Sequence, residues 1–299
     1  MPLEYDMPLY RPPVEAFSLI LQPTIGCPHN KCTFCFAYKT KRFSIKKMDE
    51  IYADIAEALK YYGPDVTHIF LADGNTIAMR TSQQLEMLAA IAAAFPHVVQ
   101  IASYAGAKFV LIKTPGDLAR IRKAGLTKLY MGVESGDPEI LRRVCKGISP
   151  EDTAAACLKL KKAGFLLSTT IVQGLGGKER FKEHAVQTAR LLNEIQPDEL
   201  RLHTLMLEPG APLWEQYQKG DFVPAGPTEV FQEARTLIGN LDLANCQLYS
   251  HGSNYLLLRG KLPDDKQYLL DTIDSVFTKD GEKALRGAGV LQDEDERAI

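Results

Sequence analysis

The chain has 299 residues, of which 45% are hydrophobic and 24% are charged, a composition usual for a folded globular protein. Its 35 lysines and arginines nearly balance 37 aspartates and glutamates, which excludes a strongly basic surface spread over the whole molecule. The longest uninterrupted apolar run, residues 87–95, is too short to span a membrane, and the opening MPLEYDMPLY lacks the basic and apolar regions of a signal peptide. We therefore expect a cytoplasmic protein with no membrane partner.

Six short runs rich in apolar and β-branched residues predict buried strands. They lie at residues 17–22, 68–73, 98–104, 128–133, 166–172 and 200–205. Between successive runs there is room for one crossover helix, as parallel strands require. Two of the intervening helices are predicted to begin at a hydroxyl residue followed by proline, at Thr114-Pro115 and Ser149-Pro150.

Two of these units resemble each other. The segments IRKAGLTKLYMGV (121–133) and LKKAGFLLSTTIV (160–172) each end a helix with basic residues and a glycine, and then enter a strand. Six βα units in a row are two fewer than a closed eightfold barrel contains. The pattern predicts an α/β fold, either a partial TIM-type (β/α)6 parallel barrel or a doubly wound open sheet, because both have this element order.

The βα pattern stops after residue 206. A connection rich in proline and glycine follows, then a helix at 231–241, an irregular stretch at 250–263 and a last amphipathic helix at 269–277. We expect this mostly helical C-terminal extension to cap a barrel. The predicted parts are an N-terminal extension (1–16), the barrel (17–220), the capping extension (221–290) and a disordered acidic tail (291–299).

The six cysteines are unevenly distributed along the chain. Because no secretory signal is recognised, a disulfide framework is not expected. Three cysteines crowd into the loop TIGCPHNKCTFCFAYKTKRF (24–43), which directly follows the first predicted strand. The other three are isolated from one another, at Cys145, Cys157 and Cys246.

The crowded cysteines are Cys27, Cys32 and Cys35, with C-x4-C-x2-C spacing. Three thiolates on one loop can bind a single soft metal centre. A four-iron cluster usually has four protein ligands, so three would leave one iron open to a cofactor or substrate. A second interpretation is a Cys3His zinc site with His29 as its fourth ligand.

The cysteine loop resembles that of the radical S-adenosylmethionine superfamily, in its coproporphyrinogen-dehydrogenase-like and Elongator-like branch. Members carry this loop after the first strand of a partial (β/α)6 barrel, most often with C-x3-C-x2-C spacing, so this chain has one additional residue. The resemblance covers residues 17–220. It implies that the three cysteines bind a [4Fe-4S] cluster, that S-adenosylmethionine binds its open iron, and that Phe34 lies near the adenine.

The ends of later strands carry residues that the same resemblance assigns to the cofactor. Asp73, Gly74 and Asn75 follow the second strand, where the family holds the methionyl amino group, although a plain turn has the same pattern. Glu134 is implied to bind the ribose hydroxyls and Lys146 the methionine carboxylate. An ion-paired Glu134 and a solvated Lys146 are the structural alternatives. The remaining implied cofactor residues are Ser103 and Gln173.

Candidates for catalysis or substrate contact come from the last strand and the extension. Arg201 and His203 alternate on the sixth strand and therefore point to the same side. A buried Arg–His pair is costly unless it meets an anion or a carboxylate, so the pair indicates either a ligand contact or a structural salt bridge. The C-terminal extension adds His251 and Asn254.

The resemblance implies an enzyme that reductively cleaves S-adenosylmethionine to a 5′-deoxyadenosyl radical and abstracts hydrogen from a small-molecule substrate. The expected partner is an electron donor such as a flavodoxin or ferredoxin, which a basic run at residues 39–47 could dock. Nucleic acid is not favoured, because neither interleaved aromatic residues nor a basic domain accompanies this run. The alternative is a non-catalytic, cluster- or zinc-bearing barrel that carries a ligand such as haem.

Overall fold

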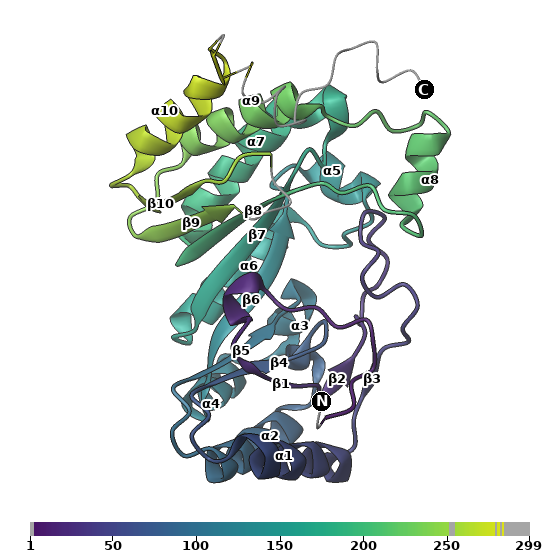
Figure 1. The fold of residues 1–299 in the computed structure, drawn as a ribbon, viewed down its shortest axis with the longest axis vertical. Coiled ribbons are helices and arrows are strands. Elements are labelled where there is room, and N and C mark those ends of the chain that lie inside the picture. Colours follow the sequence, from purple (N-terminus) through teal and green to yellow (C-terminus); the bar gives the residue numbers. More distant parts are fainter. Residues whose placement is uncertain (1–2, 251–254, 279, 282, 284–299) are drawn as a thin grey trace. The chain divides into compact units, whose positions relative to one another are not determined.

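The protein folds around a mostly parallel β-sheet (Figure 1). The structure is a computed structural model that describes residues 3–250, 255–278, 280–281 and 283. Eight strands have the order β1-β4-β5-β6-β7-β8-β9-β10, and β2 pairs separately with β3. The neighbours β1/β4, β4/β5, β5/β6 and β8/β9 are parallel, whereas β9/β10 is antiparallel. The predicted α/β class with parallel strands is confirmed.

All six predicted strands form. They are β1 (Leu19–Leu21), β4 (His68–Leu71), β5 (Gln100–Tyr104), β6 (Leu126–Glu134), β7 (Leu166–Gln173) and β8 (Glu199–Thr204). The C-terminal extension adds two strands that were not predicted, β9 (Cys246–Ser250) and β10 (Arg259–Leu262). The prediction of irregular chain at 250–263 was wrong for β10, because only Gly260 and Leu262 of its four residues are buried and its apolar pattern is too short to recognise.

The helices predicted at 231–241 and 269–277 form, each beginning a few residues earlier than predicted. In the first half of the chain the helices are α1 (Met48–Tyr62), α2 (Thr81–Ala94), α3 (Ala107–Ile112) and α4 (Pro115–Lys123), with the short 3-10 turns η1 (Pro13–Glu15) and η2 (Thr76–Ala78). The remaining helices are α5 (Pro138–Arg143), α6 (Pro150–Lys162), α7 (Gly177–Ile195), α8 (Pro212–Gln218), α9 (Pro227–Asn240) and α10 (Lys266–Val276).

Both predicted helix starts are confirmed. The Thr114 hydroxyl accepts a 3.0 Å hydrogen bond from the Asp117 N–H, and the Asp117 carboxylate accepts one from the Thr114 N–H. The Ser149 hydroxyl accepts a 3.0 Å bond from the Asp152 N–H. Each cap satisfies an N–H that has no partner within the helix, which fixes where α4 and α6 begin.

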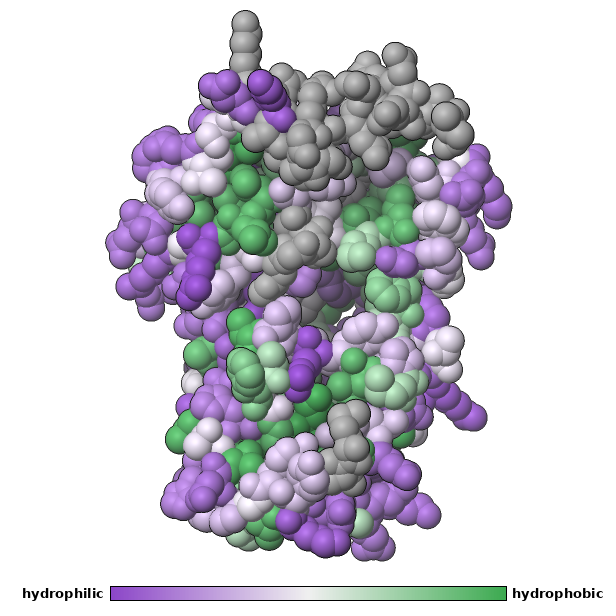
Figure 2. Space-filling view, viewed as in Figure 1, coloured by the Kyte–Doolittle hydropathy of each residue, from purple (hydrophilic) through white to green (hydrophobic). Residues whose placement is uncertain are grey.

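The chain divides into two compact units. The first comprises Met1–Gly132 with Lys146–Ser168, and the second comprises Val133–Cys145 with Thr169–Ile299. The predicted domain limits stay a prediction. Among the residues described, no helix is both long and apolar enough to cross a bilayer. Hydrophilic side chains cover much of the visible surface of each unit (Figure 2).

The core of the first unit lies on β4, β5 and β6. Phe70 and Tyr130 pack there with small alanines, and the rings of Phe70 and Tyr104 meet edge to face with centroids 5.2 Å apart. Glu15 of η1 is 1% exposed and accepts hydrogen bonds from the hydroxyls of Tyr130 and Ser18. The N-terminal segment is therefore bonded to the strands through a buried carboxylate.

A buried acid–base pair joins α7 to α9 in the second unit. His184 and Glu233 are each 1% exposed, and His184 Nδ1 lies 3.2 Å from the Glu233 carboxylate. His184 Nε2 lies 3.2 Å from the carbonyl oxygen of Glu134, the last residue of β6. Burial lowers the pKa of His184, but the charge of Glu233 and the hydrogen bonds to Glu233 and Glu134 outweigh it, so the pKa is raised overall.

Glu233 also holds the end of β7. Both of its carboxylate oxygens accept from the N–H of Gly174, at 3.1 and 3.2 Å. Helix α9 of the C-terminal extension therefore bonds directly to the residue that follows β7, and it reaches the end of β6 through His184. The extension is part of the scaffold of the second unit, because its removal would leave these polar groups buried without partners.

We expect Glu233→Ala to lower the free energy of unfolding by about 3–5 kcal/mol, because it leaves the buried imidazole of His184 and the buried N–H of Gly174 without their shared partner. Urea unfolding at constant pH measures the change. Gln232→Ala is the matched control, since Gln232 is exposed on the same helix, and it should stay within about 0.5 kcal/mol of wild type. An equal loss in both variants would contradict the assigned role.

The same pair predicts a pH dependence of stability. Because the pKa of His184 is raised above its value of about 6.5 in the unfolded chain, its contribution is fully present below that pH and is lost as the pH rises through the folded pKa. In Glu233→Gln this loss should be smaller, since the amide does not stabilise the proton. Unfolding curves recorded from about pH 6 to 9 test this; parallel pH profiles for the two proteins would refute it.

Candidate functional site

The cysteine loop of the first unit is closed at its base by a small antiparallel pair. Strand β2 (Thr24–Ile25) pairs with β3 (Ser44–Ile45), with Thr24 opposite Ile45. The cysteines therefore lie in a loop whose two ends are held side by side. All three thiols are partly exposed, so a ligand can reach them.

Hydrogen bonds within the loop hold its irregular backbone. Lys39 Nζ donates to the carbonyl oxygens of Asn30 and Cys32, at 3.0 and 2.9 Å. The Asn30 amide donates to the carbonyl of Tyr38 at 2.7 Å. The loop thus has a defined conformation around Cys32, because a charged donor bonds its backbone.

A buried carboxylate anchors the start of the loop. Asp73 is fully buried directly after β4, and its Oδ2 accepts from the Gly26 N–H at 3.0 Å and from Lys41 Nζ at 2.8 Å. Gln22 Nε2 donates to the same oxygen at 3.2 Å. Since Gly26 immediately precedes Cys27, Asp73 fixes the backbone at the first cysteine.

Glycine is required after Asp73 because the loop approaches closely. A Cβ on Gly74 would lie 2.9 Å from the carbonyl oxygen of Gly26 and 3.1 Å from Cys27 Cα. The Gly74 N–H instead donates to that carbonyl at 3.2 Å. The predicted Asp73-Gly74 pair is therefore in direct contact with the cysteine loop.

Asn75 has the features of a ligand-binding residue. Its side chain is buried, at 1% exposure, and among the described residues neither its amide oxygen nor its amide nitrogen has a hydrogen-bond partner. The amide lies close to Gly106, where an added Cβ would be 2.8 Å from Nδ2. A buried amide with both atoms unpaired is costly, and a ligand with an amino and a carboxylate group would satisfy both.

Within the described part of the chain, no three His, Cys, Asp or Glu side chains converge closely enough to hold one metal ion. Ligands of a tetrahedral zinc must converge on one centre, whereas each thiolate of an iron–sulfur cluster binds its own iron. The Cys3His zinc interpretation and the cluster interpretation of the loop cysteines both stay predictions.

Three other predicted cofactor residues also lie in the first unit. Phe34 is half-buried within the loop, and Lys146 is half-buried after α5. The Ser103 hydroxyl is already bonded, since it accepts from Thr76 Oγ1 at 2.7 Å and donates to the carbonyl of Leu71 at 2.9 Å. This gives Ser103 a structural function, and the cofactor roles of all three stay predictions.

The basic run does not form a continuous docking face. Lys41 is 7% exposed and paired with Asp73, and Lys39 bonds the loop backbone. Lys46 forms an ion pair with Asp54 at 2.7 Å. Of the five basic residues, only Arg42 and Lys47 are exposed. The sequence pattern misled here because it does not show which charges have internal partners.

In the second unit, Glu134 has a constrained backbone. It ends β6 with a φ of +67°, in the left-handed region that non-glycine residues seldom adopt and that recurs at functional sites. Burial lowers the pKa of His203, with a raising effect from the charge of Glu134 and a lowering effect from Arg201. Arg201 is buried and His203 is half-buried, and the charge of the Glu134 carboxylate acts on the imidazole of His203.

Arg201 itself is 2% exposed, and its guanidinium lies 6.0 Å from the ring centre of Tyr249 on β9. The roles of Arg201, His203 and Glu134 in catalysis or binding stay predictions. The other two candidates from the extension, His251 and Asn254, lie outside the described residues.

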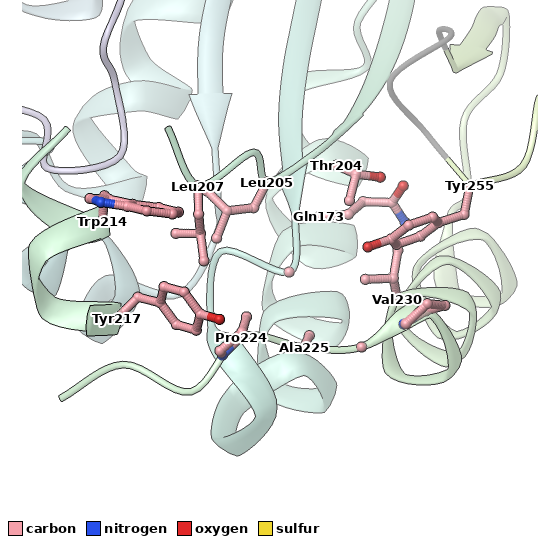
Figure 3. A pocket seen from close by; sticks show the side chains of 13 residues that line it. Gln173, Thr204, Leu205, Leu207, Trp214, Tyr217, Pro224, Ala225, Val230 and Tyr255 are labelled. Carbon is pink, nitrogen blue, oxygen red and sulfur yellow. The ribbon is translucent and has the colours of Figure 1, made fainter. Parts of the chain in front are cut away.

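A cavity of about 500 Å³ opens beyond the ends of β7 and β8 (Figure 3). Gln173, the last residue of β7, lines it and is 4% exposed. Among the described residues, Nε2 of Gln173 has no hydrogen-bond partner. Sequence reasoning identified Gln173 but not this cavity, since its walls come from segments far apart in the chain.

Sequence reasoning also missed the buried residues that support the predicted site residues. His184 and Lys41 are buried and bonded to the predicted residues Glu134 and Asp73, and Glu233 is buried and bonded to Gly174, next to Gln173. His184 and Glu233 stand on helices with ordinary amphipathic patterns, and Lys41 stands in a run of basic residues. No local signal separates them from surface charges.

Two curated relatives are similar to part of the chain. Over 122 residues it is 28% identical to the tRNA uridine(34) acetyltransferase of Methanocaldococcus infernus, and over 117 residues 24% identical to that of Methanocaldococcus jannaschii. Each match covers 39% of this chain and 22% of the relative, so the chain spans less than a quarter of their length. The expectation that nucleic acid is not a partner gains no support from them.

Solved structures of three proteins have a fold similar to that of this chain. Coproporphyrinogen III oxidase (HemN) from Escherichia coli, described as a radical SAM enzyme, superposes with a TM-score of 0.60 at 18% identity over 74% of this chain and 52% of its own. Elp3 of Methanocaldococcus infernus gives 0.52 at 16% identity, over 92% and 64% of the two chains. Methylornithine synthase (PylB) gives 0.51 at 15%, over 94% and 85%. The predicted partial barrel is confirmed at the level of fold.

The model of the radical SAM superfamily matches residues 21–192, more than half of the chain. The matched region includes the cysteine loop, β4 with Asp73, and β6 with Glu134. The chain therefore belongs to the radical SAM superfamily, whose enzymes use a [4Fe-4S] cluster and S-adenosylmethionine.

Proposed function

We propose that Cys27, Cys32 and Cys35 hold a [4Fe-4S] cluster and that the chain is an enzyme that cleaves S-adenosylmethionine reductively. The observation that carries this is the bonding of the cysteine loop to the end of β4. Asp73 fixes the loop at Gly26, and two residues further on Asn75 presents a buried amide with both polar atoms unpaired.

When bound, the cluster and cofactor supply a reductive cleavage of the sulfonium, which yields methionine and a 5′-deoxyadenosyl radical able to abstract hydrogen. The protein residues position the cofactor. Asn75 accepts from the methionyl ammonium and donates to the carboxylate, and Lys146 pairs with that carboxylate. Asp73 acts by holding the loop, and its buried Oδ1, unpaired in the described structure, is a second acceptor for the ammonium.

In this proposal the ribose of the cofactor is bound by a carboxylate. Glu134 accepts from the two ribose hydroxyls, a task that suits an ionised carboxylate at a strand end. His184 Nε2 lies 3.2 Å from the carbonyl oxygen of Glu134, and this contact stabilises the left-handed backbone of Glu134. Arg201 and His203 are candidates for contact with the substrate.

The substrate is proposed to be a small molecule that loses a hydrogen atom. A nucleic-acid substrate is the second candidate, favoured by the similarity to the two tRNA uridine(34) acetyltransferases. The rate of cofactor cleavage distinguishes the two candidates. We expect tRNA to accelerate this cleavage only if tRNA provides the abstracted hydrogen. Either substrate requires an electron donor such as a flavodoxin or ferredoxin. The basic run at residues 39–47 is not proposed as its docking surface, because that run does not form a continuous exposed face.

The ligand-carrier alternative is less well supported. Haem carries carboxylates that need cationic partners. The side chains that line the cavity of the second unit are uncharged, so this cavity does not fit such a ligand. A carrier of this kind would also leave the buried amide of Asn75 without a hydrogen-bond partner.

Alanine substitution of Cys27, Cys32 or Cys35 should abolish cofactor cleavage, because each thiolate binds one iron of the cluster. The measurement is iron and sulfide content after anaerobic reconstitution, followed by 5′-deoxyadenosine formation with dithionite. Cys145→Ala is the control, since Cys145 is exposed and is not one of the three loop cysteines, and it should retain both the iron and sulfide content and cofactor cleavage. Cleavage by a loop-cysteine variant would overturn the proposal.

Asn75→Ala should weaken S-adenosylmethionine binding by roughly tenfold or more, because a hydrogen bond to a charged group contributes about 1.5–3 kcal/mol. Equilibrium dialysis of the reconstituted protein with labelled cofactor gives the dissociation constant, and iron content should be unchanged. Asn245→Ala, at an exposed position, is the matched control. Unaltered affinity in Asn75→Ala would remove Asn75 from the cofactor site.

A further inference from the structure

The cavity in the second unit is lined by uncharged residues. Its thirteen lining residues include aromatic, aliphatic, proline and glycine residues, with Gln173 and Thr204 as polar members. None of these thirteen carries a charge. A phosphate or carboxylate placed here would lose its hydration without gaining a counter-charge, which is strongly unfavourable.

The walls suit a flat ring. Trp214 and Tyr217 of α8 lie on one side with ring centroids 5.7 Å apart, and Leu205 and Leu207 lie beside them (Figure 3). Aromatic and aliphatic surfaces of this kind bind planar groups by stacking and burial of apolar area. The volume of about 500 Å³ is within the range of small-molecule sites.

The opposite side provides a specific polar contact. Gln173 and Tyr255 face the cavity there (Figure 3). The Gln173 side chain is buried, and its Nε2, a hydrogen-bond donor, has no partner in the described part of the chain. Buried donors in folded proteins nearly always have an acceptor. A ligand with a carbonyl or ring nitrogen would provide it.

We propose that this cavity binds the substrate through an uncharged, flat heterocycle whose hydrogen-bond acceptor meets Gln173. The proposal rests on the proposed function for the identity of the reaction, but the binding step does not depend on it. In this proposal the Gln173 side chain contacts the substrate, whereas the family resemblance assigned it to the cofactor. Free bases and ring systems attached to larger molecules share this chemistry.

The single tryptophan of the chain, Trp214, lines the cavity and reports its occupancy. Fluorescence titration of the full chain with uracil should give saturable quenching. Orotate, which is uracil with a ring carboxylate, should bind at least about tenfold more weakly, because its charge would enter uncharged walls. Equal binding of the two probes, or no saturable quenching by uracil, would overturn the proposal.

Two variants test the polar contact. Gln173→Leu should weaken uracil binding about tenfold, as expected for a lost hydrogen bond in a buried site. Gln187→Leu makes the same change at an exposed position of α7 and should leave binding unchanged. Equal affinities of the Gln173 and Gln187 variants would refute the assignment.

The titration is repeated with saturating S-adenosylmethionine. Persistent quenching by uracil supports a substrate cavity, and its disappearance would assign the cavity to the cofactor and overturn the inference. Because 5′-deoxyadenosine formation is measured separately, failure of the cavity proposal and failure of the proposed function are distinguishable. A protein that cleaves the cofactor but does not bind uracil would contradict the cavity proposal and leave the proposed function intact.

Discussion

The arrangement of the first unit depends on the buried carboxylate of Asp73. It binds the backbone of the cysteine loop, a lysine from the far side of that loop and a glutamine beyond β1 through one oxygen. A buried charge of this kind is tolerated only when it is paired and hydrogen-bonded, so the loop and the strand end cannot separate without a large cost. These bonds fix the position of the loop that carries the three thiols.

The second unit uses the same device with different residues. Glu233 and His184 are buried together and hold the residue that ends β6 and the residue that follows β7. Rigid support of this kind keeps binding residues at fixed positions, and its members need not touch the ligand. The C-terminal extension therefore contributes to the second unit through a supporting helix and through the aromatic residues of a cavity.

The sequence predicted the six parallel strands, because buried strands of this kind are short apolar runs separated by segments with helical patterns, two of which begin with clear caps. It also predicted the cysteines, whose spacing needs no tertiary information. It could not predict the function of Lys41, which has the sequence environment of a surface charge and is buried by contacts with distant residues. The same limit applies to Glu233 and to the cavity around Trp214, since both depend on segments brought together by the fold. Strand β10 escaped because half of its residues face solvent.

The central claim is that the three thiols hold a cluster with an iron open to S-adenosylmethionine. The most direct measurement is electron paramagnetic resonance of the reconstituted, dithionite-reduced protein with and without the cofactor. The account predicts the signal of one reduced [4Fe-4S] cluster per chain, with a spectrum that changes when S-adenosylmethionine binds. A protein that contains one zinc and no iron, or a cluster signal that the cofactor leaves unchanged, would contradict it.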